Sequence, residues 1–147
     1  MKKIALLFLL ITMLTYGHTQ SSVIDSIQQL IPQQQGMDLI KSFHRLTVEY
    51  VRQEDYKKAT FYNRKTIDAL IQYPDSSLII FSRNYKGIIN LKTRKIDSAI
   101  HAFSEIITYI GDNPNLIKHT IGAYGNRSLC YEQKDLSHKA LDDLIQA

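Results

Sequence analysis

The side chains that could do chemistry are scattered along this chain rather than grouped. Four histidines follow the first twenty residues, and no two of them stand at metal-ligand spacing on one helix: His44, His101, His119 and His138. The neighbours Asp142 and Asp143 are typical of a solvated helix surface and not of an acid/base pair. No glycine-rich phosphate loop, metal-ligand spacing or nucleophile elbow occurs. The sequence therefore predicts a protein that is not an enzyme and that needs no cofactor or metal.

Two further features could bind or react. Cys130 is the single cysteine, so it cannot form an intramolecular disulfide, and we expect it to be a small buried hydrophobe rather than a reactive thiol. The basic run Lys92–Lys95 contains no apolar side chain, which favours a solvated turn; a phosphate- or lipid-binding patch is the alternative. We expect His101 on the solvent edge of the most apolar helix.

The N-terminus has the pattern of an export signal. Lys2 and Lys3 precede the apolar run Ile4–Leu14, and small residues lie near the polar boundary that follows. The run is shorter than the about 20 apolar residues of a membrane-spanning helix. We expect a signal peptide over residues 1–19, cleaved before Gln20, and a periplasmic or extracellular protein. An uncleaved anchor is the competing interpretation.

Charge and size limit the classes of partner. Loss of Lys2 and Lys3 lowers the formal net charge from +4 to +2, which argues against nucleic acid as a partner. Residues 20–147 suffice for one compact domain. No second apolar run long enough to span a membrane is present, so no transmembrane helix is expected after cleavage.

The elements that must position any site repeat along the chain. Ala59, Ala99 and Ala140 follow one another at offsets of 40 and 41 residues. Small residues stand twelve positions before each alanine: Thr47, Gly87 and Ser128. Other shared positions are Tyr50, Asn90 and Tyr131 nine before, and Asn63, Phe103 and Leu144 four after. Such a period is typical of stacked helical hairpins, and three unrelated amphipathic hairpins are the alternative.

Two segments resemble the tetratricopeptide repeat (TPR) family: EYVRQEDYKKA from Glu49 to Ala59, and NRSLCYEQKDLSHKAL from Asn126 to Leu141. The family repeat is shorter, about 34 residues, and the extra residues here fall at 73–76 and 111–114. The resemblance covers about 37–147. It implies an all-α fold, a TPR-like α-solenoid of about three helical hairpins (37–73, 75–111 and 114–147). The repeat positions it implies are structural: Tyr50, Ala59, Gly87, Ala99, Phe103, Tyr131 and Ala140.

By the same resemblance, the chain binds a protein or peptide in a groove lined by the first helix of each hairpin. The residues that match this face are Lys41, His44, Val48, Phe81, Asn84, Tyr85, Ile88, Asn126, Leu129 and Gln133. The carboxylate-gripping set of the co-chaperone members is not expected, because Val48 and Gly122 stand where its polar or basic members would be.

The segment IDSIQQLIPQQQG before the first hairpin carries a second resemblance. It is similar to the entry segment of exported TPR sensor proteins of Bacteroidetes-type bacteria. An exported, non-enzymatic interaction module is thus the first expectation. A truncated extracytoplasmic sensory region, or a small exported immunity or inhibitor protein, is the alternative.

Hydrophobic periodicity predicts helices over 22–31, 37–52, 56–73, 96–110, 116–133 and 136–147. Within 20–36, Val23, Ile27, Leu30 and Ile31 are expected to form the apolar face, with Ser22 as the cap. After Pro74, the stripe Leu78, Phe81, Tyr85 and Ile88 predicts another helix, capped by Asp75 or Ser76.

Three local predictions concern the C-terminal half. Gly111 is expected to end a helix, and Asn113 and Pro114 to begin the next one. Gly122 and Gly125 are expected at a close helix contact. Leu141, Leu144 and Ile145 lack a following helix in the given sequence, which favours cover by a partner, by self-association or by a continuation of the array.

Overall fold

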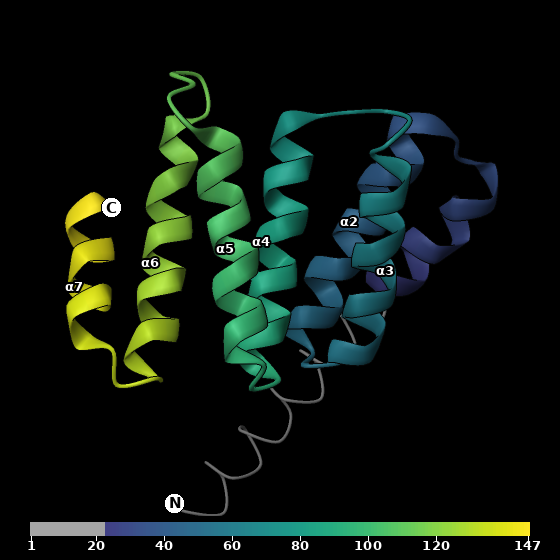
Figure 1. Cartoon of the computed structure of the whole chain (residues 1–147). Coiled ribbons are helices and arrows are strands. Elements are labelled where there is room, and N and C mark those ends of the chain that lie inside the picture. Colours follow the sequence, from purple (N-terminus) through teal and green to yellow (C-terminus); the bar gives the residue numbers. More distant parts are fainter. Residues whose placement is uncertain (1–22) are drawn as a thin grey trace, which may run out of the picture.

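The computed structural model describes residues 23–147, and within that range the chain forms helices and no strand (Figure 1). The predicted signal peptide and the proposed cap Ser22 lie outside the described residues. A first helix covers residues 23–30. It is followed by η1 (Ile31–Gln33), α2 (Gly36–Arg52), α3 (Tyr56–Ala69), α4 (Ser76–Lys92), α5 (Ile96–Ile110), η2 (Ile117–His119), α6 (Thr120–Glu132) and α7 (Ser137–Gln146).

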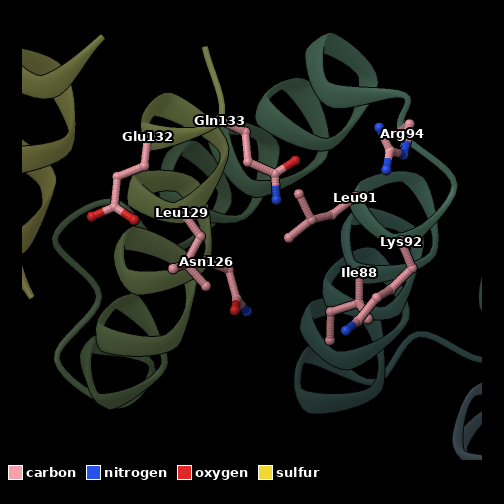
Figure 2. A pocket seen from close by; sticks show the side chains of 8 residues that line it. All are labelled: Ile88, Leu91, Lys92, Arg94, Asn126, Leu129, Glu132 and Gln133. Atoms are coloured by element: carbon pink, nitrogen blue, oxygen red, sulfur yellow. The ribbon is translucent and has the colours of Figure 1, made fainter. Parts of the chain in front are cut away.

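The helices pack in adjacent pairs, α2 with α3, α4 with α5 and α6 with α7. Neighbouring pairs join through contacts of α3 with α4 and of α5 with α6, and α4 also contacts α2 and α6. In Figure 1 the pairs follow one another along the molecule in chain order, with α7 at one end. A cavity opens between α4 and α6, the leading helices of two successive pairs (Figure 2).

The turn inside each pair has the same geometry. Glu54, Arg94 and Asp135 adopt left-handed backbone conformations, with φ of 58°, 60° and 57°. The amide of the next residue donates to a carbonyl five positions back in each case, at 2.9 Å (Asp55 to Tyr50), 2.8 Å (Lys95 to Asn90) and 2.9 Å (Leu136 to Tyr131). This bond defines a Schellman-type helix end. The three turns repeat at the same offsets as the three alanines, 40 and 41 residues.

Two acidic residues start helices as side-chain caps. Asp55 Oδ1 accepts from the Lys58 amide at 3.1 Å at the start of α3, and Asp75 Oδ1 accepts from the Leu78 amide at 2.8 Å at the start of α4. The expected cap at Asp75 is therefore confirmed, and Gly111 ends α5 with φ 47° as expected.

Asn113 does not cap a helix. Its Oδ1 accepts from the Asn115 amide at 3.0 Å inside a turn, and α6 begins at Thr120 after η2. The predicted start at residue 116 is thus four residues early. The predicted end of the α3 helix at residue 73 is also wrong, since α3 ends at Ala69 and turns follow up to Pro74.

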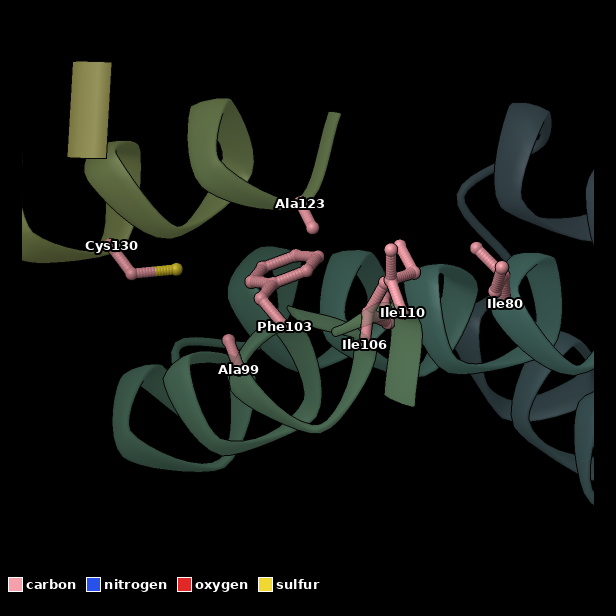
Figure 3. Close-up of a cluster of buried hydrophobic side chains, with 7 residues drawn as sticks. All are labelled: Ile80, Ala99, Phe103, Ile106, Ile110, Ala123 and Cys130. Carbon is pink, nitrogen blue, oxygen red and sulfur yellow. The ribbon is translucent and has the colours of Figure 1, made fainter. Parts of the chain in front are cut away.

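The central core lies where α4, α5 and α6 meet. Figure 3 shows its buried side chains, which come from all three helices: Ile80, Ala99, Phe103, Ile106, Ile110, Ala123 and Cys130. The small repeat residues Thr47, Gly87 and Ser128 are buried, as are Ala59, Ala99 and Ala140. Small side chains at these positions let neighbouring helices come close, as the repeat pattern predicted.

A second core lies under the first helix. Ile24 and Ile27 of residues 23–30 are buried against Leu46, Tyr50 and Ala59. The expected apolar face of this helix is therefore wrong in part: Val23 and Leu30 are exposed, because the helix turns Ile24 rather than Val23 toward α2 and α3.

The apolar stripe of α4 is not its most buried face. Phe81 is 40% exposed, whereas Ile80, Ser82, Gly87 and Ile89 are buried. Because α4 packs mainly against α3 and α5, its core-facing side turns toward those two helices, and the Phe81 stripe lies on a different side.

The expected close packing at Gly122 and Gly125 is contradicted. A Cβ built at either residue would meet no heavy atom within 4 Å beyond its own helix and chain neighbours. Their small size therefore serves no helix contact.

Candidate functional site

The predicted groove residues lie on α2, α4 and α6, and the structure brings most of them into two neighbouring groups. On the α2 side, the His44 ring stacks on Phe81 with 5.9 Å between centroids and meets the edge of Tyr85 at 5.6 Å. Phe81 also meets His119 edge-on at 5.6 Å. Lys41 and Val48 join neither group: Lys41 is exposed and Val48 is half-buried on α2.

His44 lies in an apolar setting. Its Nδ1 is buried and has no hydrogen-bond partner among the described residues. Burial lowers the pKa of His44 below its ordinary value, because desolvation disfavours the imidazolium form. The ring therefore acts as a neutral aromatic contact between α2 and α4.

An asparagine pair links α4 to α6. Asn126 Nδ2 donates to Asn84 Oδ1 at 3.0 Å, and both side chains are half-buried. This single bond leaves the Asn126 oxygen and the Asn84 amide hydrogens free to bond elsewhere. A peptide group offers the matching donor and acceptor.

Next to this pair is a cavity of about 830 Å³. It lies between the C-terminal halves of α4 and α6, and Figure 2 shows its lining: Ile88, Leu91, Lys92, Arg94, Asn126, Leu129, Glu132 and Gln133. Four of the predicted groove residues are among these, namely Ile88, Asn126, Leu129 and Gln133. Phe81 and Asn84 line a smaller cavity of about 170 Å³ that also touches His119.

The sequence interpretation missed the charged residues of the larger cavity. Lys92 and Arg94 were expected to lie in a solvated turn, with a phosphate- or lipid-binding patch as the alternative. They are exposed, and they also line the cavity wall on the α4 side. Among the described residues, neither forms an ion pair within 4 Å, and neither does Glu132 on α6. Arg94 is the residue with the left-handed backbone conformation in this turn. The 40- and 41-residue offsets of the repeat could have identified its position as a turn.

A buried ion pair holds the pair α6/α7 together. Arg127 Nε and Nη2 donate to the two carboxylate oxygens of Asp143 at 2.8 and 2.7 Å, and Arg127 Nη1 donates to Ser104 Oγ at 2.8 Å on α5. The bidentate bond raises the pKa of Arg127 further. The expectation that Asp143 is solvated is therefore wrong, because its side chain is only 6% exposed.

Two other sequence predictions about reactive groups hold. Cys130 is fully buried, and burial raises the pKa of its thiol to about 11. His101 is exposed at the solvent edge of α5, as expected, with Nδ1 3.7 Å from Glu105.

The described residues contain no cluster of three or more histidine, cysteine, aspartate or glutamate side chains that could hold a metal ion. Within residues 23–147, no helix is long and apolar enough to cross a membrane. Comparison with protein-family models, curated proteins and solved structures found no match to this chain.

Proposed function

We propose that this chain is an exported, non-enzymatic protein–protein interaction module that binds an extended peptide segment between α4 and α6. The observation that supports this most directly is the open cavity between these two helices, with apolar side chains inside and amides at its edge. Cavities with apolar lining and a few placed polar groups are the usual form of binding sites.

The architecture that we propose for the module is a TPR-like helical array. Three helix pairs share small buried residues at equivalent positions and share the left-handed turn at Glu54, Arg94 and Asp135. Stacked pairs of this kind place their leading helices on one common face. The contacts of α4 with both α2 and α6 agree with that arrangement.

Peptide is the proposed ligand class because of the chemistry at the cavity edge. Leu129 is 47% exposed on α6 and lines the cavity, so its apolar side chain is open to contact with a ligand. The Asn84–Asn126 pair offers one free acceptor and free donors beside it. A main-chain peptide group with an apolar neighbour satisfies both features.

Selection from a random peptide library displayed on phage, with the purified protein immobilised, tests this function. We expect enriched peptides, and amide chemical-shift changes concentrated in α4 and α6 when one of them is added. Leu129→Ser should abolish the enrichment. Ile121→Ser on α6, where the side chain is 58% exposed and lines neither cavity, is the matched control and should not.

Peptides that bind Leu129→Ser as well as the wild-type protein would show that the cavity is not the binding site. Failure to enrich any peptide would remove the proposed function itself.

Export is a separate part of the proposal and rests on residues 1–19. The intact mass of protein recovered from the periplasmic fraction should correspond to a chain that begins near Gln20. Full-length protein confined to the cytoplasm would contradict the signal-peptide prediction.

A further inference from the structure

The α4 side of the cavity presents two cations on a fixed backbone. Lys92 is the last residue of α4, and Arg94 is the left-handed residue of the turn that follows. The turn is held by the bond of the Lys95 amide to the Asn90 carbonyl at 2.8 Å. Thr93 Oγ1 adds a bond to the Ile89 carbonyl at 2.7 Å. The two basic side chains therefore extend from a turn whose backbone is held by hydrogen bonds.

The α6 side carries two amides, Asn126 and Gln133, and one acid, Glu132. Gln133 extends toward the α4 side in Figure 2, whereas the Glu132 carboxylate extends away from it. Between the two sides lie the apolar side chains Ile88, Leu91 and Leu129. The cavity thus combines an apolar floor with a positive rim whose cations have no acidic partner among the described residues.

We propose that this cavity selects an acidic peptide segment in which carboxylate side chains alternate with apolar ones. The inference rests on the proposed peptide-binding function and specifies its ligand. In an extended chain, alternate side chains point to opposite sides, so apolar side chains enter the floor while carboxylates face Lys92 and Arg94. Charge complementarity of this kind gives specificity in addition to contact area.

The length of the cavity matches a short stretch of extended peptide. Asn126 and Gln133 are seven residue steps apart, or roughly 10 Å at the helical rise of about 1.5 Å per residue. An extended peptide covers that distance with about three residues. A segment of the form Leu-Glu-Leu fills the cavity, with further glutamates at either end.

Nucleic acid is the less favoured polyanion. Two cations neutralise few phosphates, and a large part of nucleic-acid affinity depends on many such contacts. The apolar floor offers nothing to a sugar–phosphate backbone. A carboxylate-bearing peptide uses both halves of the cavity.

Fluorescence anisotropy with rhodamine-labelled, C-terminally amidated pentapeptides tests the inference. The probes are Glu-Leu-Glu-Leu-Glu, Lys-Leu-Lys-Leu-Lys and Glu-Gly-Glu-Gly-Glu, with an oligo-dT strand as a fourth. We expect the first to bind most tightly and to weaken as NaCl rises from 50 to 500 mM, because salt screens exposed charges. Amidation makes side-chain carboxylates the acidic groups tested.

The double variant Lys92→Gln/Arg94→Gln should weaken binding of the first peptide by about 5–10-fold, the range expected for two exposed ion pairs. The control variant Lys57→Gln/Arg64→Gln removes two positive charges from the exposed surface of α3 and should bind normally.

The outcomes separate this inference from the function on which it rests. Equal binding of the lysine peptide, lost in Leu129→Ser but kept in Lys92→Gln/Arg94→Gln, would overturn the acidic preference and leave peptide binding intact. Tighter binding of oligo-dT through the same two cations would also overturn it. Absence of binding by every peptide, together with an unproductive library selection, would overturn both.

Discussion

The ring of Phe103 on α5 lies directly over Gly87 on α4. A Cβ atom at Gly87 would come within 2.4 Å of Phe103 Cε1 and 2.6 Å of Phe103 Cζ, far inside van der Waals contact. Phe103 is fully buried, as is Ala99 one turn earlier. The absence of a side chain at Gly87 is therefore what lets the ring fill the space between the two helices.

Gly87→Ala should destabilise the protein even though alanine has the higher helix propensity. The added methyl group must displace a buried ring, and overpacking of this kind costs about 1–3 kcal/mol. Urea denaturation followed by circular dichroism measures the free energy of unfolding. Gly87→Ala/Phe103→Leu should recover part of the loss, because the smaller side chain gives way to the new methyl group.

Gly122→Ala and Gly125→Ala are the matched controls within the same fold. Nothing stands within 4 Å of a Cβ at either position, so only helix propensity changes. Each should raise the free energy of unfolding by up to about 1 kcal/mol. Destabilisation by these controls equal to that of Gly87→Ala would mean that the Phe103 contact is not the cause.

The repeat pattern predicted much of this packing because it depends on residue size. Small residues at Gly87 and Ala99, with a large one at Phe103, indicated a close helix crossing, and the structure has one there. The same reasoning failed at Gly122 and Gly125, because glycine in a helix is also compatible with open surface. Size alone does not say which face of a helix meets a neighbour.

Polar contacts between residues far apart in the chain could not be predicted from the sequence. Asn63 interrupts the apolar pattern of α3, yet it is buried and its Nδ2 donates to the Ser82 carbonyl at 3.0 Å on α4. In the sequence, Asp143 resembles an ordinary surface residue. In the structure it pairs with Arg127, which is sixteen positions earlier. Likewise, Lys92 and Arg94 become part of a candidate site only when α6 lies opposite. Local spacing contains no information about such partners.

Removing one partner of the Arg127–Asp143 pair should cost about 3 kcal/mol, because the other charge is left buried and uncompensated. Asp143→Asn and Arg127→Met test the two sides, with the free energy of unfolding as the measurement. Arg127→Met/Asp143→Leu should be less destabilised than either single variant, since no buried charge remains. Asp142→Asn, at an exposed position, should change stability by less than about 0.5 kcal/mol. Additive effects in the double variant would contradict a direct coupling.

Glu54→Gly should stabilise the protein. Glu54 has φ 58°, a conformation that costs an L-residue with a side chain roughly 1–2 kcal/mol and glycine little. Part of that gain is offset by the greater freedom of glycine in the unfolded chain, so we expect a net gain of about 0.5–1 kcal/mol. Glu54→Ala keeps the unfavourable backbone and should give no such gain. Loss of stability in Glu54→Gly would show that the Glu54 side chain, not the turn geometry, matters there.

His44 should make the protein less stable in mild acid. Burial lowers its pKa in the folded state, so as pH falls below the ordinary value of about 6.5 the unfolded chain binds a proton that the folded chain does not yet accept. The free energy of unfolding then falls from about pH 6.5 down to the folded-state pKa, and is constant below it. Between pH 7.5 and 5.5 this loss cannot exceed about 1.4 kcal/mol, the value for a ring that stays wholly neutral when folded.

Thermal denaturation at the two pH values should show a smaller difference for His44→Gln than for the wild type, because the variant has no group to titrate at that place. His138→Gln, at an exposed position of α7, should keep the wild-type difference. If His44→Gln and the wild type lose equal stability, the acid sensitivity originates elsewhere and the apolar contact of His44 with Phe81 and Tyr85 does not govern it.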